Sequence, residues 1–261
     1  MIQFNFNRFG KLALWTLTNE KKYNLKSFLQ NLVVLTLVFV FFTSVTVKWD
    51  QQDANYVPCS IATIVVFAVT LILGSSFMFY SMDGKHDMQT LLMLPASNFE
   101  KYLMRYASWI ILLPIQLAAF FAADLIQYVY GLVVGHDEVM FVTSAVIEYV
   151  GKVWCKMQIP EHAQQTWIEG VVLHAVWFHS LFALGATFFR SHKHNWMLTS
   201  AVLIFMFTLL MIILGWGSVN ATWWNNHGIY SLLLLLLIVF NFWLSYRLFC
   251  RTQVIGKFVN L

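Results

Sequence analysis

Residues 58–80, with the sequence PCSIATIVVFAVTLILGSSFMFY, contain no charged side chain. A helix of about 20 predominantly apolar residues is long enough to cross the hydrocarbon core of a lipid bilayer. The bilayer offers no hydrogen-bond partners to backbone N–H and C=O groups, so an isolated spanning segment must satisfy them within a helix. This stretch therefore predicts a transmembrane helix.

Five further stretches have the same character, and the third of the full set could extend to Val134. The six expected spans are Phe28–Val47, Pro58–Tyr80, Ala107–Gln127, Ile168–Phe189, Met197–Trp216 and Ile229–Phe249. None of them alternates polar and apolar residues as a strand of a membrane barrel would. The expected fold is therefore an all-α integral membrane domain that comprises residues 1–261.

The composition of the whole chain agrees with this expectation. Hydrophobic residues make up 59% of the 261 residues and charged residues 11%, whereas a soluble domain has about 45–50% and about 25%. An ordinary soluble enzyme, a disordered chain and a nucleic-acid-binding protein are excluded on this ground. Three scattered cysteines, Cys59, Cys155 and Cys250, are too few for a disulfide framework or a zinc site.

The basic residues are distributed unevenly between the two sides that six spans would create. If the N-terminus is cytoplasmic, 13 of the 16 Lys and Arg residues fall on the inner side, and only Lys48, Lys152 and Lys156 fall outside. Cytoplasmic loops of membrane proteins carry such an excess of basic residues. The sequence therefore predicts a multi-pass protein with both termini in the cytoplasm.

Two segments outside the spans have amphipathic patterns. Residues 1–27 are expected to form a helix in the inner membrane interface, starting near Asn7, although a basic tail that only fixes topology is the alternative. The outer connection 135–167 contains 139–157, whose apolar residues share one helical face. We expect an amphipathic helix there, with a seventh span as the alternative.

The largest expected cytoplasmic loop is 81–106, with the sequence SMDGKHDMQTLLMLPASNFEKYLMRY. Ser97 and Glu100 have the spacing of a capping box, and they follow a proline at position 95. The loop is therefore expected to form a short helix, a break at Pro95, and a second helix that continues into the third span. Its apolar cluster among charged residues suits docking of another protein, while a connector that touches only lipid headgroups remains the alternative.

The stretch 91–102, LLMLPASNFEKY, resembles a motif of bacterial ABC-2-type permeases, the membrane subunits of ATP-binding-cassette exporters. In that family a leucine-rich helix leads to Leu-Pro-x-Ser before the third span. The six spans, the N-terminal interfacial helix and the cytoplasmic ends are similar as well. The resemblance implies that loop 81–106 is the coupling segment that contacts the ATPase, through Asp83, Lys85, Asp87, Leu91, Leu92, Pro95, Glu100 and Lys101.

The same resemblance implies a bacterial cytoplasmic membrane and two permease subunits, identical or different, that form the pathway together. No phosphate-binding loop is found in the sequence, because Gly84-Lys85 lacks the preceding glycine and the following Ser or Thr. ATP is therefore expected to bind to a separate P-loop ATPase subunit. We expect no catalytic residue, metal or cofactor in this chain, and membrane lipids but no nucleic acid among its partners.

Polar residues inside the spans are candidates for a transport pathway, because buried polar groups are costly in a membrane and usually face protein or water. In the third span, Gln116, Asp124 and Gln127 lie on a similar face, although Asp124 could instead be an acid at the outer interface. His174 and His179 lie in the fourth span. They could line the pathway or form hydrogen bonds with neighbouring helices.

The two histidines also raise the alternative of an intramembrane enzyme, such as a prenyl-type peptidase that uses Glu169, His174 and His179. Five residues turn a helix by about 500°, so the two rings point about 140° apart, whereas a zinc-binding pair on one helix has i and i+4 spacing. This geometry disfavours a metal site. A membrane scaffold or immunity protein without transport activity is the third hypothesis.

Overall fold

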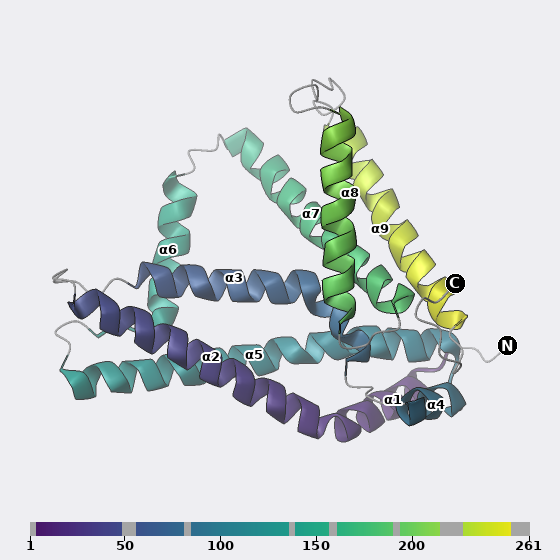
Figure 1. The fold of residues 1–261 in the computed structure, drawn as a ribbon, viewed down its shortest axis with the longest axis horizontal. Helices are drawn as coiled ribbons and strands as arrows, with labels where there is room; N and C mark the ends of the chain where they lie inside the picture. Colours follow the sequence, from purple (N-terminus) through teal and green to yellow (C-terminus); the bar gives the residue numbers. More distant parts are fainter. Residues whose placement is uncertain are drawn as a thin grey trace. The chain divides into compact units, whose positions relative to one another are not determined.

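A computed structural model describes residues 4–48, 56–80, 85–135, 139–156, 161–189, 194–214 and 227–251. The secondary-structure elements assigned within these residues are all helices (Figure 1). They are α1 (Phe6–Asn19), α2 (Lys21–Lys48), α3 (Val57–Leu73), the 3₁₀ helix η1 (Gly74–Phe79), α4 (Lys85–Met93), α5 (Asn98–Val134), α6 (Val142–Lys156), α7 (Glu161–Phe188), α8 (Asn195–Leu214) and α9 (His227–Cys250).

Five helices of the described part are long and apolar enough to cross a membrane: α2, α3 together with η1, α5, α7 and α9. The prediction of an all-helical, multi-pass membrane protein is confirmed at this level. The remaining expected span, 197–216, falls on α8, whose residues Asn195–Leu209 form a shorter apolar helix. Residues 215 and 216 lie outside the described part of the chain.

The chain folds into two compact units. The first contains residues Met1–Thr16, Leu71–Trp109 and Pro160–Leu261, and the second contains Leu17–Thr70 and Ile110–Ile159.

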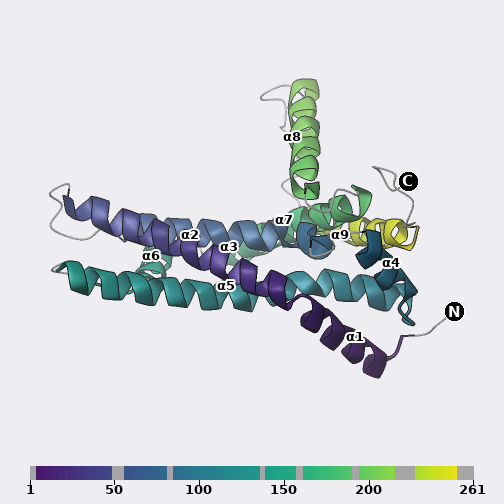
Figure 2. The same ribbon diagram turned by 60° about the horizontal axis from the view of Figure 1, so that its bottom comes forward.

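In the second unit, α2, α3 and the later part of α5 run alongside one another, and α6 crosses them (Figures 1 and 2). Phe120 of α5 lies at its centre, because the rings of Phe39 and Phe67 each meet it edge-on with centroids 6.0 Å apart. The buried core of this unit consists of Leu35, Phe39, Tyr56, Cys59, Phe120, Ala123, Val142 and Ala145.

In the first unit, α7 packs along α9 and also contacts α8 and η1. Gly185 of α7 lies directly against the side chain of Thr199 of α8. A small residue allows two membrane helices to approach closely. The buried core of this unit consists of Met78, Phe79, Leu91, Tyr102, Ala186 and Phe249.

The expected span 58–80 differs from a uniform α-helix, because residues 74–79 near its end form η1. Gly74 begins this 3₁₀ segment, and the indole of Trp109 occupies the place where a side chain would be. A Cβ atom on Gly74 would lie 2.9 Å from Cε3 of Trp109. The tighter turn leaves α-helical carbonyl groups without their usual donors, and side chains of other helices donate to them instead.

The helices expected outside the spans, at the N-terminus, in loop 81–106 and in the outer connection, are present, but their boundaries differ from the expected ones. The first helix ends at Asn19, and α2 begins at Lys21, so residues 21–27 belong to the second helix rather than to the interfacial one. The second loop helix does run into the third span, as α5 of 37 residues, which Pro114 does not interrupt. The amphipathic segment expected within 139–157 is α6.

Candidate functional site

The α4–α5 junction, residues 85–106, contains the expected capping box. The backbone N–H of Ser97 donates to Oε2 of Glu100 at 2.6 Å, and the backbone N–H of Glu100 donates to Oγ of Ser97 at 3.2 Å. These bonds satisfy N–H groups that the first turn of a helix leaves without intrahelical partners. They begin α5 directly after the break at Pro95.

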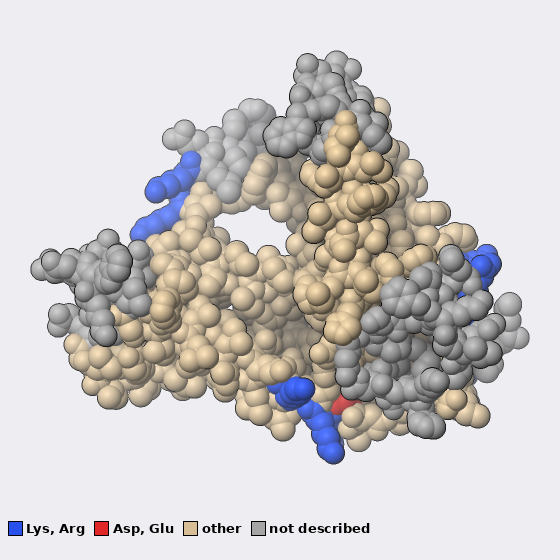
Figure 3. All heavy atoms as spheres, in the orientation of Figure 1, with Lys and Arg blue, Asp and Glu red and all other residues tan. Residues whose placement is uncertain are grey.

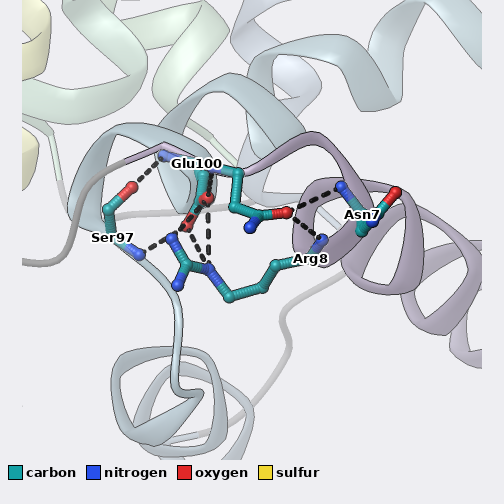
Figure 4. A network of polar contacts seen from close by, with 5 residues as sticks. Asn7, Arg8, Ser97 and Glu100 are labelled. Carbon is teal, nitrogen blue, oxygen red and sulfur yellow. Dashed lines mark hydrogen bonds and ion pairs between the residues drawn. The ribbon is translucent and has the colours of Figure 1, made fainter.

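Glu100 also binds the start of α1 (Figure 4). Arg8 donates through Nη2 to Oε1 at 2.7 Å and through Nε to Oε2 at 3.0 Å, and the backbone N–H of Asn5 donates to Oε1 at 2.8 Å. The side chain of Glu100 is fully buried, and that of Arg8 is 31% exposed. The hydrogen bonds from Arg8 are the main cause that lowers the pKa of Glu100 to about 2.

Asn5 has a second role in the same contact. Its side-chain Oδ1 accepts hydrogen bonds from the backbone N–H groups of Asn7 at 2.9 Å and Arg8 at 3.3 Å. This is the arrangement of an N-cap residue. Asn5 therefore caps α1 with its side chain while its own N–H holds α1 to Glu100.

Two cations of the junction are also turned inward. Lys101 donates through Nζ to the carbonyl of Leu92 at 2.6 Å, and Arg105 donates through Nε to the carbonyl of Met78 at 3.0 Å. Carbonyl groups at helix C-termini carry a partial negative charge, so both contacts are favourable. Burial lowers the pKa of Lys101. Together with Glu100, these residues bind α1, α4 and η1 to the first turns of α5.

The structure describes the side chains of five of the eight expected ATPase-contacting residues, and most of these are turned into the protein. Leu91, Glu100 and Lys101 are buried within the chain, with Leu92 partly buried. Pro95 is exposed. Asp83 lies outside the described residues, and the side chains of Lys85 and Asp87 are not described.

Besides Pro95, an expected contact, the junction presents outward two residues that were not among the expected ones. Met93 is 85% exposed and Phe99 is 48% exposed, and together with Pro95 they form what we call the exposed edge. The signal was available in the sequence: Leu91 and Met93 lie 200° apart on a helix with 100° per residue, so they could not face the same side. Arg8 was missed as well, because nothing in a sequence indicates which distant cation binds a buried acid.

Aromatic rings connect the exposed edge to α9. Phe99 lies between Phe4 and Tyr246, with ring centroids 6.1 Å and 5.8 Å away. Tyr246 continues to Tyr102 at 5.5 Å, and Tyr102 donates its hydroxyl to Oγ of Ser245 at 3.0 Å. The junction is thus packed against the end of α9 as well as bound to α1.

The structure gives Asp124, one of the candidate pathway residues, a clear role within the second unit. Its Oδ1 accepts the backbone N–H of Val142 at 2.6 Å, and its Oδ2 accepts the backbone N–H and the Oγ1 hydroxyl of Thr143 at 3.1 Å and 2.6 Å. Asp124 is 2% exposed. A carboxylate at a helix N-terminus is favourable, so Asp124 on α5 acts as the cap of α6.

The two glutamines of the same helix are buried. Gln127 donates through Nε2 to the hydroxyl of Tyr56 at 3.4 Å, a hydroxyl that also accepts the backbone N–H of Met140 at 3.1 Å. The Oε1 atom of Gln127 has no partner among the described residues. Gln116 is 2% exposed. Asp124 directly, and Gln127 through Tyr56, hold the segment around α6 against the rest of the second unit.

His179 satisfies a carbonyl group near the switch from α3 to η1. Its Nδ1 lies 2.6 Å from the carbonyl of Leu71, and its Nε2 lies 2.9 Å from the hydroxyl of Tyr106. A carbonyl only accepts, so Nδ1 carries the proton and Nε2 accepts from Tyr106. Ser75 of η1 returns a hydrogen bond to the carbonyl of His179 at 2.7 Å.

His174 has a similar pattern of partners. Its Nδ1 lies 2.6 Å from the carbonyl of Gly170, and its Nε2 lies 2.5 Å from the hydroxyl of Tyr230. Both histidines thus hydrogen-bond neighbouring helices, and all four ring nitrogens meet protein atoms. Within the described residues, no three His, Cys, Asp or Glu side chains are grouped so that they could hold a metal ion.

One buried polar pair was not anticipated. Asn195 at the start of α8 donates through Nδ2 to the carbonyl of Ser76 in η1 at 2.7 Å. Its Oδ1 and the Oγ of Ser76 have no hydrogen-bond partner in the described part of the chain. Asn241 on α9 joins this helix to α7 by donating through Nδ2 to Oγ of Ser180 at 2.9 Å.

Comparison of the chain with models of protein families, with curated proteins and with solved structures gave no match.

Proposed function

We propose that this chain is the membrane-spanning subunit of an ATP-driven transporter of the ABC-2 type. In this proposal α8 completes the set of six spans as the fifth in chain order, both termini are cytoplasmic, and two such subunits form the pathway in a bacterial cytoplasmic membrane. A separate P-loop ATPase subunit binds the α4–α5 junction from the cytoplasm. The chain itself carries out no covalent chemistry.

The observation that carries the proposal is the construction of the α4–α5 junction. Its exposed edge of Met93, Pro95 and Phe99 is apolar, while two of its charged residues, Glu100 and Lys101, are turned inward and fix its shape. An apolar surface on a rigid support is suited to contact with another protein.

The continuity of α5 supports the same proposal. The junction ends in a helix of 37 residues, which is roughly 55 Å long at 1.5 Å per residue. The later part of the junction, residues 98–106, and the apolar segment 107–127 are therefore parts of one helix. A partner that closes on ATP would use this connection to drive transport.

The test measures binding of the ATPase subunit to variants of the exposed edge. Met93→Asp and Phe99→Asp should each weaken binding by roughly tenfold or more, since burying such side chains contributes about 1.5–3 kcal/mol and an unpaired carboxylate would be desolvated. The matched control is Ile147→Asp on α6, an apolar residue that is 70% exposed and expected outside. It should leave ATPase binding unchanged.

The intramembrane-enzyme alternative makes the opposite prediction. It requires His174→Ala and His179→Ala to abolish activity, whereas variants of the exposed edge would do little. In our proposal, the histidine variants retain ATPase binding and have modest effects on transport. Loss of activity in both histidine variants, with no P-loop ATPase recovered with the wild-type chain, would refute the transporter assignment.

A further inference from the structure

The first turns of α2 carry a group of exposed basic side chains. Lys21, Lys22 and Lys26 are exposed, and none of them has an ion pair or hydrogen bond to another described residue. Glu20, the neighbouring acid, is only 8% exposed. Figure 3 shows blue side chains gathered at the lower edge of the molecule, over the segment in which Figure 1 places the beginning of α2.

An apolar stripe continues from these lysines along the same face of the helix. At 100° per residue, Lys22, Lys26, Leu29 and Val33 lie within about 60° of one another. Leu25, Leu29, Val33 and Leu37 are all exposed, by 60%, 49%, 54% and 65%. Thus α2 presents cations at one end of a face and aliphatic side chains along the rest of it.

We propose that this face of α2 binds an anionic phospholipid, with its phosphate group at Lys22 and Lys26 and an acyl chain along Leu29, Val33 and Leu37. The position follows from the membrane itself, because residues that directly precede an apolar span lie at the level of the headgroups. From Lys26 to Leu37 the helix rises about 16 Å, which is comparable to the length of an acyl chain. Lys21, on the adjacent side, adds positive charge near the headgroup.

The charges decide which lipid the face prefers. A basic residue near an anionic membrane surface contributes binding energy that corresponds to roughly a fivefold gain in affinity, and the effect decreases with added salt. A zwitterionic lipid offers the same acyl chain but no net negative charge. The face should therefore prefer phosphatidylglycerol to phosphatidylcholine. This inference does not rest on the transporter assignment.

The experiment uses native mass spectrometry of the full chain in a neutral detergent, titrated with phosphatidylglycerol or phosphatidylcholine. The wild-type chain should bind phosphatidylglycerol more tightly. The triple variant Lys21→Gln, Lys22→Gln, Lys26→Gln should lose roughly 100-fold in affinity for it at low salt if the three effects add. Replacing all three lysines by arginine should preserve binding, since the charge is kept.

The matched control neutralises two lysines elsewhere in the second unit, Lys152→Gln and Lys156→Gln on α6. Lys152 already pairs with Glu148, so phosphatidylglycerol binding should not change. The triple variant leaves 10 basic residues on the expected inner side against 3 outside, and circular dichroism verifies its helix content. If the triple variant misfolds, Lys22→Gln alone should still cost about fivefold.

Four results would overturn the proposal. Equal affinity of the wild-type chain for both lipids would remove the charge preference. Unchanged phosphatidylglycerol binding in the glutamine variants, or an equal loss in the α6 control, would place the lipid elsewhere. Loss of binding to an acidic protein subunit, with lipid binding intact, would assign the lysines to a protein interface instead.

Discussion

At the scale of single residues, Arg8 and Glu100 form the ion pair that joins α1 to the α4–α5 junction. Arg8→Ala leaves the buried carboxylate with only the N–H groups of Asn5 and Ser97. Loss of hydrogen bonds to a charged group costs about 1.5–3 kcal/mol. We therefore expect faster hydrogen exchange in α1, measured by mass spectrometry. Lys11→Ala, which removes an exposed cation from the same helix, should have no such effect, and equal acceleration in both variants would contradict this role of Arg8.

The same pair predicts a dependence on pH. The pKa of Glu100 is lowered from 4.5 to about 2 in the folded protein, so its contribution to stability is fully present above about pH 4.5 and is lost as the pH falls toward 2. Spin labels at Leu14→Cys and Asn98→Cys, in a background without the native cysteines, should report separation of α1 from the junction in this window. The variant Glu100→Gln should show no transition there. Separation between about pH 5 and 7 would be incompatible with the low pKa.

Gly185 gives a prediction about packing between α7 and α8. A Cβ atom there would overlap the side chain of Thr199, so Gly185→Ala should destabilise the protein by about 1–3 kcal/mol, measured by denaturant unfolding. Gly170, on the same helix, has open space around it. Gly170→Ala should be neutral or slightly stabilising, and Thr199→Ala should partly restore stability to Gly185→Ala.

At the scale of elements, the sequence predicted most helices because the bilayer imposes their length and apolar composition. The capping box at Ser97 and Glu100 was also predictable, since it depends on residues three positions apart. The 3₁₀ segment η1 was not, because it depends on Trp109 lying against Gly74, a contact between positions distant in sequence. The burial of Glu100 and Lys101 could not be predicted either, because it depends on contacts with residues of other helices.

Asp124 is another residue whose role depends on a contact that the local sequence does not reveal, and it gives a prediction for α6. As an acid in an apolar span it indicated either a polar pathway or the outer membrane interface, and the structure shows in addition that its two oxygens cap another helix. Asp124→Asn removes the charge and one acceptor, so the first turn of α6 should exchange its amide hydrogens faster. Glu148→Gln is the matched control, because its ion pair with Lys152 is exposed and contributes little. Unchanged exchange at Val142 and Thr143 in Asp124→Asn would refute the capping role.

At the scale of the whole molecule, the described helices and the basic residues can be combined into one topology. Of the six expected spans, five coincide with helices long enough to cross a membrane, and the remaining one, 197–216, falls on α8. The 13-to-3 distribution of Lys and Arg then predicts that both termini and the α4–α5 junction lie in the cytoplasm. The side on which each segment lies depends on the membrane and the insertion machinery, so it is decided by experiment.

This topology predicts on which side of the membrane two connections lie, the one between α5 and α6 and the one between α7 and α8. Single cysteines at Asp137, before α6, and at Lys193, before α8, would be placed in a background without the native cysteines. A membrane-impermeant thiol reagent added to intact cells should label position 137 and leave position 193 unlabelled until the membrane is opened. A detergent-solubilised sample, in which both positions should react, controls for reactivity of the thiols. If α8 did not span, a cysteine in place of Thr252 would be labelled from outside while position 193 stayed protected. If 139–157 formed a seventh span, positions 193 and 252 would both be labelled from outside. Labelling of position 252 from outside would contradict six spans, because an even number of crossings returns the chain to the side on which it began.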